Sequence, residues 1–98
     1  MSQRTFFVYI LGNERPTLYT GMTNNLQRRL YEHKQGLCDG FTKRYHLTQL
    51  LYYESGDSAM GAIIREKQIK NMGRQAKLDL IRSKNPPMKD LSDEILPH

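Results

Sequence analysis

The feature that most constrains the fold of this chain is an unbroken apolar run, Phe6 to Leu11, followed by a punctuated turn. The run combines aromatic, β-branched and aliphatic side chains, which is typical of a strand covered on both faces. Gly12, Asn13 and Pro16 then interrupt the pattern, and Thr17 to Met22 resumes it. We therefore expect a hairpin with a loop of about five residues, its first strand central in a small sheet.

The hairpin carries two tyrosines whose relation depends on the turn. If the turn centres on Glu14, Tyr9 lies opposite Tyr19 and both phenols share one face with Gly21. A slip of one residue would send the phenols to opposite faces.

A helix is predicted directly after the hairpin. Thr23 or Asn24 can cap its start, it should run to about Gln35, and Gly36 can end it in a left-handed conformation.

Two basic side chains border the apolar face of this helix. At about 100° per residue, Leu26, Arg29, Leu30 and His33 share one arc, whereas Arg28 lies to one side. Arg29 and His33 then either face a functional site, or Arg29 extends beside the core and His33 is a hydrogen-bonded histidine at its edge.

The next segment, GLCDGFTKRYH from Gly36 to His46, has two glycines and no helical period, so we expect a long loop. Lys43, Arg44 and Tyr45 place basic and aromatic side chains together. Such a cluster suits phosphate and base contacts, although a solvated charged turn has the same composition.

The second half predicts a strand and two helices. Leu47 to Glu54 reads as a third strand. A helix capped by Asp57 or Ser58 should run to about Met72, with Gly73 as its stop. The last predicted helix is Arg74 to Ser83.

Glu66 should lie inside the apolar arc of the first of these two helices, between Ala62 and Ile63 and near Ala59. A buried unpaired carboxylate is costly, so Glu66 requires a cationic partner, a metal ion or an opening to solvent. An internal pair with an arginine is the plainest of these alternatives.

Size and charge limit the function classes. The 98 residues suffice for one domain with one modest core. Fifteen Lys and Arg against ten Asp and Glu give a net charge of +5, which favours a polyanionic partner, with a merely soluble basic protein as the alternative. Cys38 is the one cysteine and no apolar run approaches the roughly 20 residues of a membrane span, so we expect a cytoplasmic protein without a disulfide.

The tyrosine pair, the Arg29 and His33 pair and the helical Glu66 together resemble the GIY-YIG nuclease domain. Phe7-Val8-Tyr9 stands at the family's first tripeptide and Tyr19-Thr20-Gly21 at its second. The ending resembles that of small single-domain bacterial members, with Asn85-Pro86 before Asp90-Leu91. Asn71 and Asn85 are both candidates for the late asparagine of the family.

The resemblance implies an α+β domain: a small three-stranded, mainly antiparallel sheet in the order strand-strand-helix-strand-helix-helix. We expect this domain over residues 1–85 and a tail over residues 86–98 that could dock on it. The implied activity is hydrolysis of DNA phosphodiester bonds, structure-selective or weakly specific, in repair or recombination. RNA remains an alternative substrate, and a protein partner could supply target selection.

The resemblance also assigns roles. Tyr9 is the candidate general base, assisted by Tyr19 and His33, while Arg29 stabilises charge on the phosphate and Glu66 binds a single Mg²⁺ or Mn²⁺ ion. The residues expected to contact nucleic acid are Gly21, Arg28, Lys43, Arg44 and Tyr45.

Two rival hypotheses use the same residues. The chain could be a non-catalytic nucleic-acid-binding module on this scaffold. Alternatively, the tyrosines could be core aromatics and Glu66 the ion-pair partner of Arg29.

Overall fold

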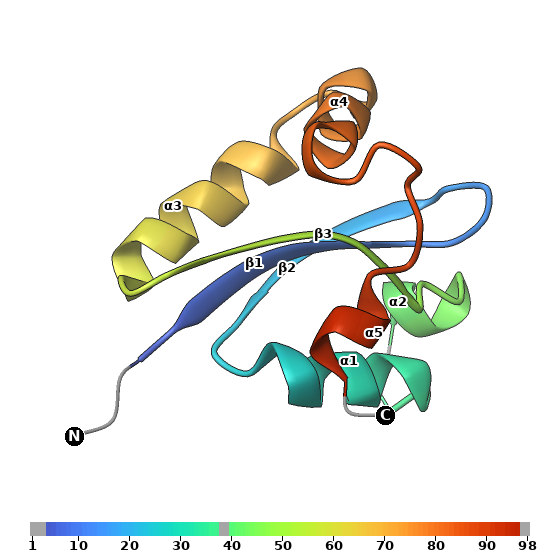
Figure 1. Ribbon diagram of the computed structural model, residues 1–98, viewed down its shortest axis with the longest axis horizontal. Helices are drawn as coiled ribbons and strands as arrows, with labels where there is room; N and C mark the ends of the chain where they lie inside the picture. Colours follow the sequence, from blue (N-terminus) through green and yellow to red (C-terminus); the bar gives the residue numbers. More distant parts are fainter. Residues whose placement is uncertain (1–3, 38–39, 97–98) are drawn as a thin grey trace.

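A computed structural model describes residues 4–37 and 40–96, so Cys38 lies outside the described part of the chain. Within that part, β1 (Phe6–Gly12) is the central strand of a three-stranded antiparallel sheet, between β2 (Leu18–Thr23) and β3 (Gln49–Gly56) (Figure 1). The α+β class and the antiparallel sheet are therefore as predicted.

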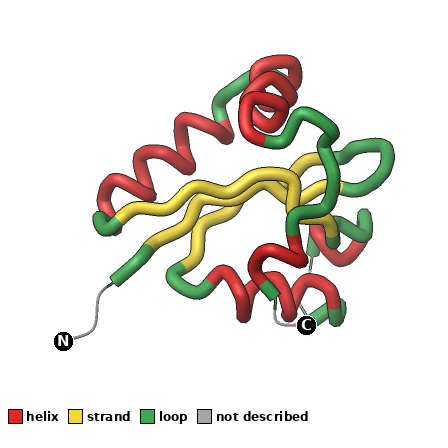
Figure 2. The backbone as a smooth tube through the Cα atoms, in the orientation of Figure 1, coloured by secondary structure: helices red, strands yellow, loops and turns green. Residues whose placement is uncertain are grey.

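Helices cover both faces of the sheet (Figure 2). On one face lie α3 (Ala59–Lys70) and α4 (Arg74–Lys84). On the other lie α1 (Leu26–Lys34), α2 (Phe41–Arg44) and α5 (Ser92–Ile95). In the described residues, no helix has the length and apolar character of a membrane span.

The alternation of β1 divides the core into two layers. Val8 and Ile10 point toward α3 and α4, whereas Tyr9 and Leu11 point toward α1. All four are buried, as expected of a central strand covered on both sides. The first layer also contains Leu51, Tyr52, Ala62, Ile69 and Ile81, and the second contains Leu26, Leu30, Leu47 and Leu50.

The predicted pairing of Tyr9 with Tyr19 is wrong by two residues. Tyr9 pairs with Gly21, and Leu11 pairs with Tyr19. The cause is the loop, in which the side-chain oxygen of Asn13 accepts hydrogen bonds from the backbone N–H groups of Arg15 (3.0 Å) and Thr17 (2.7 Å). The turn consequently centres on Arg15, and because the slip is an even number of residues, both tyrosines remain on one face.

The start of α1 also differs from the prediction. Asn25, not Thr23 or Asn24, is the cap, and its side chain accepts the N–H of Arg28 at 3.0 Å. The side-chain oxygen of Thr23, two residues before this cap, accepts a hydrogen bond from the backbone N–H of Asn25. Gly36 follows the helix with φ 68°, which confirms the left-handed stop.

The cap of α3 is Ser58, as predicted, and it accepts the N–H of Gly61 at 3.0 Å. The helix ends at Lys70, before Met72, and Gly73 (φ −65°) instead precedes α4 as its extended N-cap. The loop expected over Gly36 to His46 contains the one-turn helix α2, which is too short to leave a periodic signal.

The C-terminal segment crosses β3 and is held by two polar side chains. The buried amide of Asn85 donates to the carbonyl oxygens of Leu51 and Lys89, both at 2.9 Å. Asp90 accepts the N–H of Leu50 at 3.0 Å and pairs with Lys34 at 3.1 Å. Leu91, Ile95 and Leu96 pack against the core layer on the α1 side.

Candidate active site

Three aromatic rings from three elements meet beneath α1. The ring centroids of Tyr9 and Tyr19 are 6.5 Å apart, and that of His33 lies 6.2 Å from Tyr9 and 6.3 Å from Tyr19. Strand alternation turns both tyrosines to this face, and helical spacing turns His33 inward with Leu26 and Leu30. We call Tyr9, Tyr19 and His33 the tyrosine–histidine cluster.

Gly21 is fitted to this cluster. A Cβ atom at position 21 would lie 2.5 Å from the hydroxyl oxygen of Tyr9 and 3.0 Å from a ring carbon of Tyr19. The absence of a side chain at Gly21 therefore creates the space that the two rings occupy.

The cluster becomes more exposed from Tyr9 outward. Tyr9 is 0% exposed, His33 is buried and Tyr19 is partly buried. Burial lowers the pKa of His33, the positive charge of Arg29 lowers it further, and Glu32 opposes the change. These effects favour the uncharged imidazole of His33 and make it a weaker base than a histidine in water.

Arg29 lies one helical turn before His33, at the rim of the cluster. Its Nε atom is 3.5 Å from Oε1 of Glu32, and both side chains are about one third exposed. Because Arg29 pairs with Glu32 and Glu66 with Lys70, the rival hypothesis of an ion pair between Glu66 and Arg29 is wrong. The guanidinium stays within reach of solvent and of a bound anion.

Glu66 occupies the packed side of α3, near the buried Ala62 and Ile69. Its carboxylate is 3.5 Å from Nζ of Lys70 and its side chain is 22% exposed. The predicted apolar arc through Ala59 and Ile63 is wrong, since both are exposed. α3 packs on β1 and β2 from the face opposite α1, and the convergence of Glu66 with the cluster stays a prediction.

The residues of this region fit a metal ion that is held by one protein carboxylate. The described ranges contain no group of three or more His, Cys, Asp or Glu side chains that could enclose an ion. One partly open carboxylate, Glu66, matches an ion that takes its other oxygen ligands from water and from a substrate phosphate.

A sequence profile of the GIY-YIG catalytic domain matches residues 5–79 of the chain. The chain belongs to the GIY-YIG family. This family is one of nucleases, and the match spans all the predicted catalytic residues, from Tyr9 to Glu66.

Relatives of this GIY-YIG chain are similarly short. A UPF0213 protein from Syntrophus aciditrophicus is 44% identical over 81 residues, covering 82% of this chain and 92% of that protein. Another UPF0213 protein, from Clostridium perfringens, is 37% identical over 89 residues, covering 91% of this chain and 96% of that protein. The solution NMR structure of a UPF0213 protein from Bacillus halodurans superposes with a TM-score of 0.58 at 27% identity, covering 88% of this chain and 92% of that chain.

The residues expected to contact nucleic acid fall at separate places on the GIY-YIG domain. Gly21 is enclosed by the two tyrosines. Arg28 lines a shallow pocket with Tyr31 and Leu96 on the outer side of α1. Lys43, Arg44 and Tyr45 are exposed together at α2.

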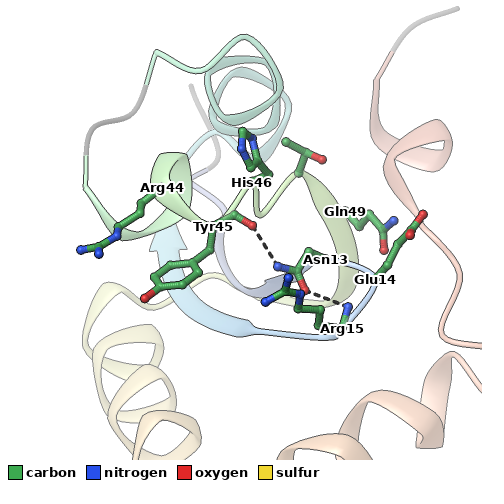
Figure 3. Close-up of a pocket in the computed structure, with 8 residues that line it drawn as sticks. Asn13, Glu14, Arg15, Arg44, Tyr45, His46 and Gln49 are labelled. Atoms are coloured by element: carbon green, nitrogen blue, oxygen red, sulfur yellow. Dashed lines mark hydrogen bonds between the residues drawn. The ribbon is translucent and has the colours of Figure 1, made fainter.

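An open polar pocket of about 490 Å³ lies beside α2 (Figure 3). Arg15, Arg44, Tyr45 and His46 contribute to its lining, and among the described residues Glu14 is its one carboxylate. The Asn13 side chain donates to the Tyr45 carbonyl at 2.9 Å and so ties the hairpin loop to α2.

Phe41 is the residue that the sequence pattern did not single out. Its ring lies 6.5 Å from Tyr19 and 4.8 Å from Tyr45, measured between centroids. Its place among the aromatic and basic residues before His46 was the available signal. Its contact with Tyr19 required the fold.

Proposed function

We propose that this chain is a divalent-metal-dependent endonuclease that hydrolyses DNA phosphodiester bonds in repair or recombination, with structure-selective or weakly specific cutting. The observation that carries the proposal is the tyrosine–histidine cluster, closed around Gly21 in a chain of the GIY-YIG family. Arg29 at its rim supplies a fixed positive charge for a phosphate.

The different burial of Tyr9 and Tyr19 suggests different roles for the two phenols. A fully buried Tyr9 does not meet bulk water, so we assign contact with the attacking water to the partly exposed Tyr19. A phenol is a poor base unless its own proton can leave, and we assign that proton to the imidazole of His33, whose ring centroid lies 6.3 Å from that of Tyr19. Tyr9 then acts as a positioning residue beneath both rings.

The remaining charge is handled by Arg29 and Glu66. Arg29 stabilises the negative charge that develops on the phosphate as the water oxygen attacks phosphorus and the ester P–O bond breaks. Glu66 would hold one Mg²⁺ or Mn²⁺ ion, which when bound polarises the phosphate and stabilises the leaving oxygen. Lys70 must release the carboxylate for that role, and its own side chain is 51% exposed, so its ammonium group can return to water.

A cleavage assay tests the proposal. Wild-type protein should cut branched, nicked or single-stranded DNA in Mg²⁺ or Mn²⁺ and not in EDTA. Glu66→Gln should slow cutting by on the order of 100-fold with an unchanged fold. Asp79→Asn, which removes one exposed carboxylate charge on α4, is the matched control and should cut normally. Failure of the wild-type protein to cut any of these DNAs, or equal rates for Glu66→Gln, would refute the assignment.

A non-catalytic nucleic-acid-binding module is the second candidate, favoured by the exposed Lys43, Arg44 and Tyr45. It predicts salt-dependent binding of DNA with no cleavage under any metal condition. In either case we expect the protein to be cytoplasmic and to bind DNA, with RNA as the alternative nucleic acid. A protein partner would then supply target selection.

A further inference from the structure

A continuous row of aromatic rings leads from the core to the surface. It runs from Tyr9 and His33 through Tyr19 to Phe41 and Tyr45, with successive centroids 4.8 to 6.5 Å apart. The inner end of the row is buried and the outer end is exposed, since Tyr9 is 0% exposed whereas Phe41 is 47% and Tyr45 40% exposed. The outer two rings therefore offer apolar surface to a ligand directly beside Tyr19, the residue assigned to the attacking water.

The outer pair is held in place by the fold. Between Phe41 and Tyr45, the side chain of Thr42 is buried, and its carbonyl accepts the N–H of the fully buried Leu47 at 2.9 Å. The carbonyl oxygen of Tyr45 accepts a hydrogen bond from the side-chain amide of Asn13, as Figure 3 shows. A platform anchored in this way is preorganised, so a ligand does not have to order it on binding.

Positive charge surrounds the platform. The guanidinium of Arg44 lies 5.7 Å from the centre of the Tyr45 ring, and Lys43 is exposed on the same turn. Arg15 lines the adjoining pocket of about 490 Å³ with Arg44, and Glu14 is a carboxylate in the same lining. Flat apolar rings flanked by cations are complementary to nucleobases flanked by phosphates.

We propose that Phe41 and Tyr45 form a stacking platform for unpaired nucleobases next to the scissile phosphate, while Arg15 and Arg44 contact the neighbouring phosphates. Bases inside a duplex already stack on one another and cannot cover these rings. The preferred substrate is therefore a strand with unpaired nucleotides at the cut, such as a flap, a loop or a single strand. This substrate class rests on the proposed nuclease function, whereas the platform itself requires only nucleic-acid binding.

The test measures binding without cleavage. Fluorescence anisotropy in EDTA should compare a single-stranded DNA of about 15 nucleotides, its blunt duplex, and RNA of the same sequence. Wild-type protein should prefer the single strand. Phe41→Ala and Tyr45→Ala should each weaken single-strand binding about 5- to 100-fold and leave duplex binding nearly unchanged.

Two further variants separate stacking from general damage. Phe41→Tyr keeps an aromatic face and should retain wild-type affinity. Ile64→Ala removes a side chain of similar exposure (51%) from α3, on the far face of the sheet, and should bind normally. Circular dichroism would verify that each variant is folded.

The outcomes distinguish this inference from the function on which it builds. Binding that depends on Phe41 without any cleavage would support the platform and reject the nuclease. Cleavage of unpaired and fully paired DNA at equal rates, with Phe41→Ala as active as wild type, would overturn the platform and keep the nuclease. Tighter binding of RNA than DNA would support the platform and assign it an RNA strand, whereas equal losses on single strand and duplex would overturn it.

Discussion

At the scale of single residues, Gly21 determines whether the proposed site can form. The pairing of Gly21 with Tyr9 brings the backbone of β2 under two aromatic rings that pack on each other and on His33. Rings in a packed interior cannot move aside without displacing their own neighbours. The position therefore links local stability directly to the geometry of the cluster.

Replacing Gly21 with Ala should destabilise the protein by about 1–3 kcal/mol, because its Cβ would overlap the hydroxyl oxygen and ring of Tyr9. Urea denaturation measures the change. Gly56→Ala is the matched control, since a Cβ there meets no atom within 4 Å, and its effect should stay within about 0.5 kcal/mol. Equal effects of the two substitutions would contradict the close packing at Gly21.

The environment of His33 predicts a dependence of stability on pH. Burial, and then Arg29, lowers the pKa of His33 in the folded state below its ordinary value of 6.5. Below pH 6.5 the unfolded chain then binds a proton that the folded chain resists, so the free energy of unfolding falls as pH drops from 6.5 to the folded pKa. His33→Gln, which does not titrate, should lose less stability between neutral and mildly acidic pH. Parallel losses in the two proteins, measured by urea midpoints, would show that another group is responsible.

At the scale of elements, the C-terminal segment works as a strap across β3. Burial raises the pKa of Asp90 more than any other single cause alters it. Hydrogen bonds from the Ser92 hydroxyl and from the Leu50 and Ser92 N–H groups, with Lys34, together outweigh burial and lower the pKa below its ordinary value of 3.8. The strap is thus fully formed at neutral pH and weakens as pH falls through the lowered pKa.

The side chain of Asn85 is the second anchor of the strap. Replacing it with alanine should lower the free energy of unfolding by about 1–3 kcal/mol. Asn85→Ala would leave the Leu51 carbonyl buried without its donor. Asn71→Ala, at the exposed end of α3, should change stability by no more than about 0.5 kcal/mol. Thermal denaturation of both variants makes the comparison, and a larger loss at Asn71 would show that the structural asparagine has been misassigned.

Elements with a strong local signal were predictable from the sequence. The apolar run of β1 and the Ser58 cap of α3 are examples, because alternation and capping act within a few residues. The hairpin register was not, since it depends on how the Asn13 side chain organises the loop. α2 and the exposed role of Phe41 were missed because one turn has no period, and a contact with Tyr19 exists only in the folded chain.

At the scale of the whole molecule, the sheet separates two faces that carry different functional residues. The α1 face carries the tyrosine–histidine cluster and the basic, aromatic α2, whereas the other face carries α3 with Glu66. β2 is the outer strand on one side of the sheet and is packed against α3. We expect the substrate strand to pass this edge, from the platform at Phe41 toward the carboxylate of Glu66.

The most direct measurement of this arrangement is a crystal structure of the protein with Mn²⁺ and a slowly hydrolysed phosphorothioate single strand. The anomalous signal of manganese should lie at the Glu66 carboxylate, with one phosphate reaching both the ion and the side chains of Tyr19 and Arg29. Manganese bound away from Glu66, or a phosphate that contacts Glu66 but neither Tyr19 nor Arg29, would contradict the proposed active site.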